Sequence, residues 1–66
     1  MTLFKTRADA IERSSDATAR NLRKAAAAKK RGDTEAMRHY AKVAKDLDQV
    51  TTRLADGDID QLIENP

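Results

Sequence analysis

A row of basic residues at helical spacing is the part of this sequence best suited to chemistry with a partner. Four cations follow one another from Arg13 to Arg31 at intervals of seven, four and seven residues, so an α-helix would align them on one face. The row would extend over about 27 Å at 1.5 Å per residue and could bind successive phosphates by counterion release. With two flanking cations, the candidate contacts for nucleic acid or an acidic partner are Arg13, Arg20, Arg23, Lys24, Lys30 and Arg31.

The same row also fits an ordinary solvated helix face. The net charge of +2 conceals an asymmetry: residues 1–31 contain nine Lys or Arg and three Asp or Glu, whereas residues 32–66 contain four and eight. The basic half could therefore pair with the acidic half of its own chain or of a second copy. The row has no aromatic residue on its face for base stacking, so any nucleic acid would be held by phosphate contacts or by shape.

Two other groups could do chemistry but lack the partners that the chemistry requires. His39 beside Tyr40 could transfer protons, yet no nucleophile or second polarised group accompanies them. The alternating aspartates of Asp56–Asp60 resemble the start of a calcium loop, but Gln61 stands where that loop requires glycine. We therefore expect a non-enzymatic protein without catalytic residues, metal site or cofactor.

Length and composition limit how such a chain can be stabilised. Its 66 residues, 39% hydrophobic and 36% charged, predict one small domain over residues 1–66. A domain of this size usually needs disulfides, a metal or self-association, and the chain has no cysteine and one histidine. No apolar run approaches the roughly 18 residues of a membrane span, and the N-terminal residues lack a signal-peptide apolar region. We expect a cytoplasmic protein that does not bind membranes.

The elements that would position these residues are separated by a break at Gly32-Asp33. Helix-period segments on both sides predict helix 1 at about residues 3–31, a turn at 32–33, helix 2 at about 34–55 and a short C-terminal helical turn at 58–63. Thr6, with Asp9 three residues later, fits the start of helix 1, and Asp33 fits the start of helix 2. Gly32 and Gly57 are placed to end the two helices. The predicted fold is an all-α antiparallel hairpin.

Apolar stripes on the two segments predict how the hairpin would pack. On helix 1 the spacing alternates between four and three residues, which is typical of a heptad seam, and on helix 2 the stripe is about 100° wide. Folded at Gly32, Leu22 would face Val43, Ile11 would face Leu54, and Phe4 would meet Leu62. The stripe on helix 1 comprises Phe4, Ala8, Ile11, Ser15, Thr18, Leu22, Ala25 and Lys29. The stripe on helix 2 combines two neighbouring lines, Ala36, Tyr40, Val43, Leu47, Val50 and Leu54 in one and Met37, Ala44 and Thr51 in the other.

The stripe of helix 2 is wider than one alanine-rich partner helix can cover. Two hairpins would complete it by dimerising into a four-helix bundle. We therefore expect a homodimeric interaction, assembly or regulatory protein that acts on a protein partner through its helical faces. The alternative is a nucleic-acid-binding regulator that contacts phosphates through the basic row. The candidate oligomer or partner interface comprises Phe4, Met37, Tyr40, Val43, Val50, Leu62 and Ile63.

Overall fold

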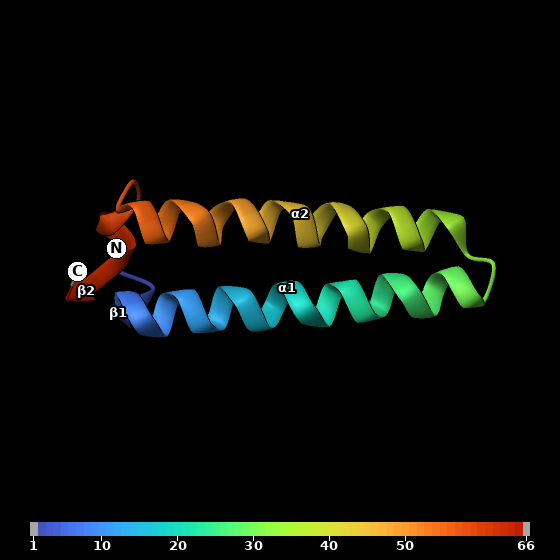
Figure 1. Ribbon diagram of the computed structural model, residues 1–66, viewed down its shortest axis with the longest axis horizontal. Coiled ribbons are helices and arrows are strands. Elements are labelled where there is room, and N and C mark those ends of the chain that lie inside the picture. The colour runs from blue at the N-terminus through green and yellow to red at the C-terminus, as the bar shows by residue number, and fades with distance from the viewer. Residues whose placement is uncertain (1, 66) are drawn as a thin grey trace.

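Two long antiparallel helices make up most of the protein. The computed structural model describes residues 2–65, with helix α1 at Arg7–Lys30 and helix α2 at Thr34–Asp56. The helices lie side by side along the long axis (Figure 1), and the molecule measures 43 × 18 × 15 Å. The expectation of a mostly helical chain folded as a two-helix hairpin is confirmed.

Side-chain caps fix where each helix begins. The hydroxyl of Thr6 accepts a hydrogen bond from the backbone N–H of Asp9 at 3.1 Å. The carboxylate of Asp33 accepts one from the backbone N–H of Ala36 at 3.0 Å. Each bond satisfies a donor that the first turn of a helix leaves unpaired. Both caps are as predicted.

Two glycines with left-handed backbone conformation follow the helices. Gly32 has φ 76° and donates its N–H to the carbonyl of Lys29 at 3.0 Å, which closes the turn between α1 and α2. Gly57 has φ 84° at the end of α2. Residues with a Cβ rarely adopt these angles, so the predicted stops at both glycines are confirmed.

The end of the hairpin opposite the turn differs from the prediction. Strand β1 (Phe4–Thr6) precedes α1, and a 3₁₀ turn η1 (Asp60–Leu62) leads into strand β2 (Ile63–Asn65). The strands pair in parallel, with Phe4 opposite Ile63. The predicted start of helix 1 near residue 3 is therefore wrong. The short helical turn predicted over 58–63 is present as η1 but covers only Asp60–Leu62, because Ile63 belongs to β2. The Thr6 cap delays α1 to Arg7, and the chain before it satisfies its backbone by pairing with the C-terminal segment.

The main core lies at the end of the hairpin opposite the turn, which we call the closed end because the β1–β2 pair closes it. Ala10, Leu54, Ile59 and Ile63 form a buried cluster, and four half-buried side chains pack against it: Phe4, Ile11, Val50 and Leu62. Along the rest of the hairpin the buried hydrophobic side chains within residues 2–65 are alanines of α1 and α2: Ala25, Ala28 and Ala44. The sequence predicts that Phe4 lies near Leu62, and Ile11 near Leu54. Both predictions are confirmed to the extent that all four side chains belong to or pack against this one cluster.

Helix α1 meets α2 through a stripe that coincides only in part with the predicted one, since Ala25 belongs to both and Ile11 packs against the core cluster. Ala10, Ser14, Ala25 and Ala28 are buried, whereas Ser15 is exposed and Leu22 keeps 54% of its surface exposed. The expectation that Leu22 faces Val43 in the core is wrong, because α1 is rotated by about one residue, or 100°. Small residues let the helices approach closely.

Ser14 shows why the closer approach is favoured. Its hydroxyl donates to the backbone carbonyl of Leu47 at 3.0 Å and lies 2.5 Å from the hydroxyl of Thr51. The side chain is 5% exposed, and a buried hydroxyl requires such partners. A bulky side chain at this position would separate the helices and remove both hydrogen bonds.

Candidate functional site

The six candidate cations of α1 and its C-terminal cap are all exposed. Arg13 forms an ion pair with Asp9, with 3.1 Å between Nε and Oδ1, and its side chain is 70% exposed. None of the other five forms an ion pair with a residue in the range 2–65. The only ion pair between the two halves in that range joins Arg7 to Asp60. The charge asymmetry is thus left largely uncompensated within one copy of the described hairpin.

Near the turn, the basic row borders the apolar stripe of α2. The ammonium of Lys24 lies 5.6 Å from the centroid of the Tyr40 ring, within the range of a cation–π contact. The ring of Tyr40 also meets the edge of His39, with 5.3 Å between centroids. Lys24 and Tyr40 therefore lie on one side of the hairpin.

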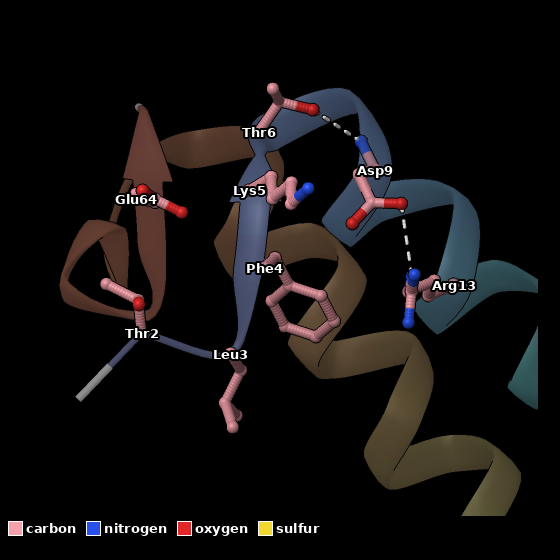
Figure 2. Close-up of a pocket in the computed structure, with 8 residues that line it drawn as sticks. All are labelled: Thr2, Leu3, Phe4, Lys5, Thr6, Asp9, Arg13 and Glu64. Carbon is pink, nitrogen blue, oxygen red and sulfur yellow. Dashed lines mark hydrogen bonds and ion pairs between the residues drawn. The ribbon is translucent and has the colours of Figure 1, made fainter.

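The same side of the hairpin carries a hollow at the closed end. The hollow has a volume of about 520 Å³. Figure 2 shows Asp9 between Thr6 and Arg13, joined to each by a dashed contact, with the Phe4 ring nearby against α2. Phe4 and Val50 both pack against the core cluster. The residues that line the hollow are Thr2, Leu3, Phe4, Lys5, Thr6, Asp9, Arg13 and Glu64.

The Lys24–Tyr40 contact and the hollow lined by Arg13 and Phe4 mark the two ends of one surface, which we call the basic–apolar face. Arg13 lies near Phe4 at one end and Lys24 lies over Tyr40 at the other. Between them, the basic row continues along α1 at intervals of seven, four and seven residues, and the apolar stripe continues along α2 at intervals of three, four and three. The apolar members are half-buried. The face consists of Arg13, Arg20, Lys24 and Arg31 from the α1 segment, and of Tyr40, Val43, Leu47 and Val50 from α2.

A second surface lies on the other flank of α1 and contains Ile11, Ser15, Thr18 and Leu22. We call it the Leu22 seam. It retains the heptad spacing of the predicted stripe. In the structure Ile11 packs against the core cluster and Thr18 is half-buried, whereas Ser15 and Leu22 are exposed beside the contact with α2. Because 200° separates Leu22 from Arg20 around the helix at 100° per residue, the seam and the basic row point in nearly opposite directions.

The predicted interface residues are distributed over the molecule. Tyr40, Val43 and Val50 share the basic–apolar face, and Met37 is half-buried near the turn. Phe4 and Leu62 are half-buried at the closed end, whereas Ile63 is 4% exposed and belongs to the core. The fold does not gather these seven residues into one patch.

Arg7 is a structural residue that the sequence pattern did not reveal. Its guanidinium donates to the backbone carbonyl of Leu54 and forms an ion pair with Asp60 at 2.8 Å. The Oδ1 atom of Asp60 is buried and accepts no hydrogen bond within the described residues, so the ion pair is what compensates it. Arg7 thereby joins the start of α1 to the end of α2 and to η1.

A second hollow, of about 410 Å³, lies beside the turn. Its lining combines two carboxylates with His39 and Tyr40: Asp33, Glu35, Ala36, His39 and Tyr40. Within residues 2–65, no three His, Cys, Asp or Glu side chains are grouped so that they could hold a metal ion. Nor is any helix in that range long and apolar enough to span a bilayer.

In comparisons with known proteins, no family model, curated protein or solved structure matches this chain.

Proposed function

We propose that this is a non-enzymatic interaction protein that self-associates and binds a partner protein through its helical faces. The observation that carries the proposal is the incomplete core. Among the described residues, Leu54 is the one large side chain that is fully buried. The other large apolar side chains of α2 are only half-buried along the hairpin, and Leu22 of α1 is 54% exposed. Apolar surface left in this way usually serves as an interface.

The exposed area supports a second copy as one occupant. The chain exposes 4817 Å², whereas a compact monomer of 7.3 kDa would expose about 4,200 Å². The excess of about 600 Å² approaches the ~800 Å² that each partner contributes to a standard interface. Its radius of gyration is 13.7 Å, against about 11 Å for a compact domain of this length.

The Leu22 seam is the surface on which we place the second copy. Leu22 is a large apolar side chain that is 54% exposed, and the small residues at heptad spacing beside it would allow another helix to approach closely. Two hairpins joined along their α1 helices would form the four-helix bundle expected from the sequence. The cytoplasmic location remains a prediction.

The test compares two leucines that are both largely exposed but lie on different parts of the hairpin. Leu22→Glu should shift the sedimentation equilibrium toward the monomer, because a carboxylate at a dimer seam has no compensating partner. Leu3→Glu is the matched control, since Leu3 is 63% exposed at the closed end and outside the seam. Equal effects of the two substitutions would refute the seam, and a wild-type chain that stays monomeric would refute self-association.

Nucleic-acid binding is the second candidate function. It is favoured by Arg20, Lys24 and Arg31 of the basic row, which form no ion pair within residues 2–65. Such binding would weaken steeply as salt increases. Substitution of Arg20 and Lys24 by alanine would weaken it for all base sequences alike and reduce its salt dependence by about one unit for each phosphate that is no longer bound. Fluorescence anisotropy with duplex DNA and structured RNA at low and physiological salt would measure both effects.

A further inference from the structure

We infer that the basic–apolar face receives an acidic amphipathic helix of a partner protein. The inference rests on the proposed interaction function and specifies the chemistry of the partner. It follows from the placement of the cations of α1 directly beside the half-buried apolar stripe of α2.

The apolar part of the face requires a partner with apolar side chains. Val43, Leu47 and Val50 follow Tyr40 at intervals of three, four and three residues and are half-buried. A helix with apolar residues at the same intervals would bury them by packing against α2, as amphipathic helices do in hydrophobic grooves. Phosphate groups would gain nothing from this stripe, which favours a protein over nucleic acid as the occupant.

The charged part of the face requires that the partner be acidic. Arg20, Lys24 and Arg31 form no ion pair with any residue from 2 to 65. Carboxylates flanking the apolar stripe of an incoming helix would lie opposite these cations and would both steer its approach and select it over basic helices. A two-fold interface pairs identical patches. A second copy on this face would therefore place its own cations opposite those of the first copy, and the like charges would repel.

The dimensions of the face indicate the size of the partner helix. The distance from Arg13 to Arg31 along α1 is about 27 Å, which corresponds to about 18 residues of a partner helix. At the closed end the face continues into the hollow bordered by Phe4, Lys5 and Arg13. This hollow could accept a side chain from the end of the incoming helix.

Three labelled probes distinguish the possible occupants by fluorescence anisotropy on the full chain. The first is a synthetic helical peptide of about 18 residues with leucines at intervals of three and four and flanking glutamates. The second has lysines in place of the glutamates, and the third is duplex DNA. We expect saturable binding of the glutamate peptide at physiological salt, and binding at least tenfold weaker for the lysine peptide.

Substitutions in the chain then test whether the glutamate peptide binds at the basic–apolar face. Arg20→Ala with Lys24→Ala should weaken the glutamate peptide about five- to tenfold, as the removal of two surface ion pairs would. Lys42→Ala with Lys45→Ala is the matched control, because it removes two exposed cations of α2 outside the face, and it should have less than a twofold effect. Val43→Asn should weaken binding at least tenfold by interrupting the apolar stripe. Far-ultraviolet circular dichroism verifies that each variant retains its helix content.

The outcomes separate this inference from the function on which it rests. Equal binding of the two peptides, or equal effects of the two double substitutions, would overturn the acidic partner and leave a protein-binding function standing. Binding of DNA with neither peptide bound would overturn the inference and favour the nucleic-acid-binding function. If Val43→Asn converted a dimer to a monomer, the second copy would be the occupant of this face and the inference would be wrong.

Discussion

Leu54→Ala should remove a large part of the stability of the hairpin. Leu54 is fully buried at the centre of the cluster formed with Ala10, Ile59 and Ile63. Truncation of a buried leucine to alanine costs about 2–5 kcal/mol, because it loses apolar transfer energy and leaves a cavity. A chain of 66 residues has about 3–10 kcal/mol in total at typical values per residue.

The expected effect on thermal unfolding follows from the size of the chain. At about 2.1 cal/mol/K per residue, the entropy of unfolding makes 1 kcal/mol equivalent to about 7 °C. A loss of about 3 kcal/mol would therefore lower the melting temperature by about 20 °C. The assay is the circular dichroism signal of the helices during heating, at one fixed protein concentration.

Leu3→Ala provides the control for Leu54→Ala, since it is the same substitution at a side chain that is 63% exposed. It should change the melting temperature by only a few degrees. Leu54→Met, which nearly conserves volume, should cost less than about 1.5 kcal/mol. The reasoning would be refuted if Leu54→Ala destabilised the protein no more than Leu3→Ala.

The remaining predictions concern hydrogen bonds and backbone conformations that define the ends and the seam of the helices. Ser14→Ala should lower the free energy of unfolding by about 1 kcal/mol in urea titrations, because the carbonyl of Leu47 loses its interhelical donor; no change would mean that this hydrogen bond is unimportant. Thr6→Ala should cost about 1 kcal/mol through loss of the cap on Asp9, measured in the same way, and a neutral effect would show that β1 alone fixes the start of α1. Gly57→Ala should destabilise by about 1 kcal/mol because alanine disfavours φ 84°, and a stabilised variant would contradict that conformation.

Features set by local sequence could be predicted from the sequence. The caps at Thr6 and Asp33 and the left-handed glycines depend on a few neighbouring residues, and all are found where the residue types indicate. The turn at Gly32-Asp33 then dictates an antiparallel hairpin, since the intervening connection is too short for any other arrangement of two long helices.

The strand pair could not be predicted in this way. Phe4 and Ile63 are 59 positions apart in the chain, and each strand has three residues. Such short segments carry no readable alternation of apolar and polar side chains. The strands form because the hairpin brings the two ends of the chain together, and this is a tertiary effect.

The rotation of α1 was also hidden from sequence reasoning. The stripe through Leu22 and the stripe through Ser14 both consist mainly of small or apolar residues, so periodicity alone favours the one with the larger side chains. Packing against α2 selects the smaller stripe, because it brings the hydroxyl of Ser14 to the backbone of α2. The same selection exposes Leu22 and aligns the basic row with Tyr40, so the candidate surfaces follow from a rotation that the sequence did not show.

The most direct test of the account is the mass of the wild-type chain in solution, measured by sedimentation equilibrium over a wide range of protein concentrations. Because Leu22 is 54% exposed on the seam where we place the second copy, we predict a particle of twice 7.3 kDa that dissociates on dilution. A mass of 7.3 kDa at every concentration, with a melting temperature independent of concentration, would contradict self-association as the means by which this protein completes its core.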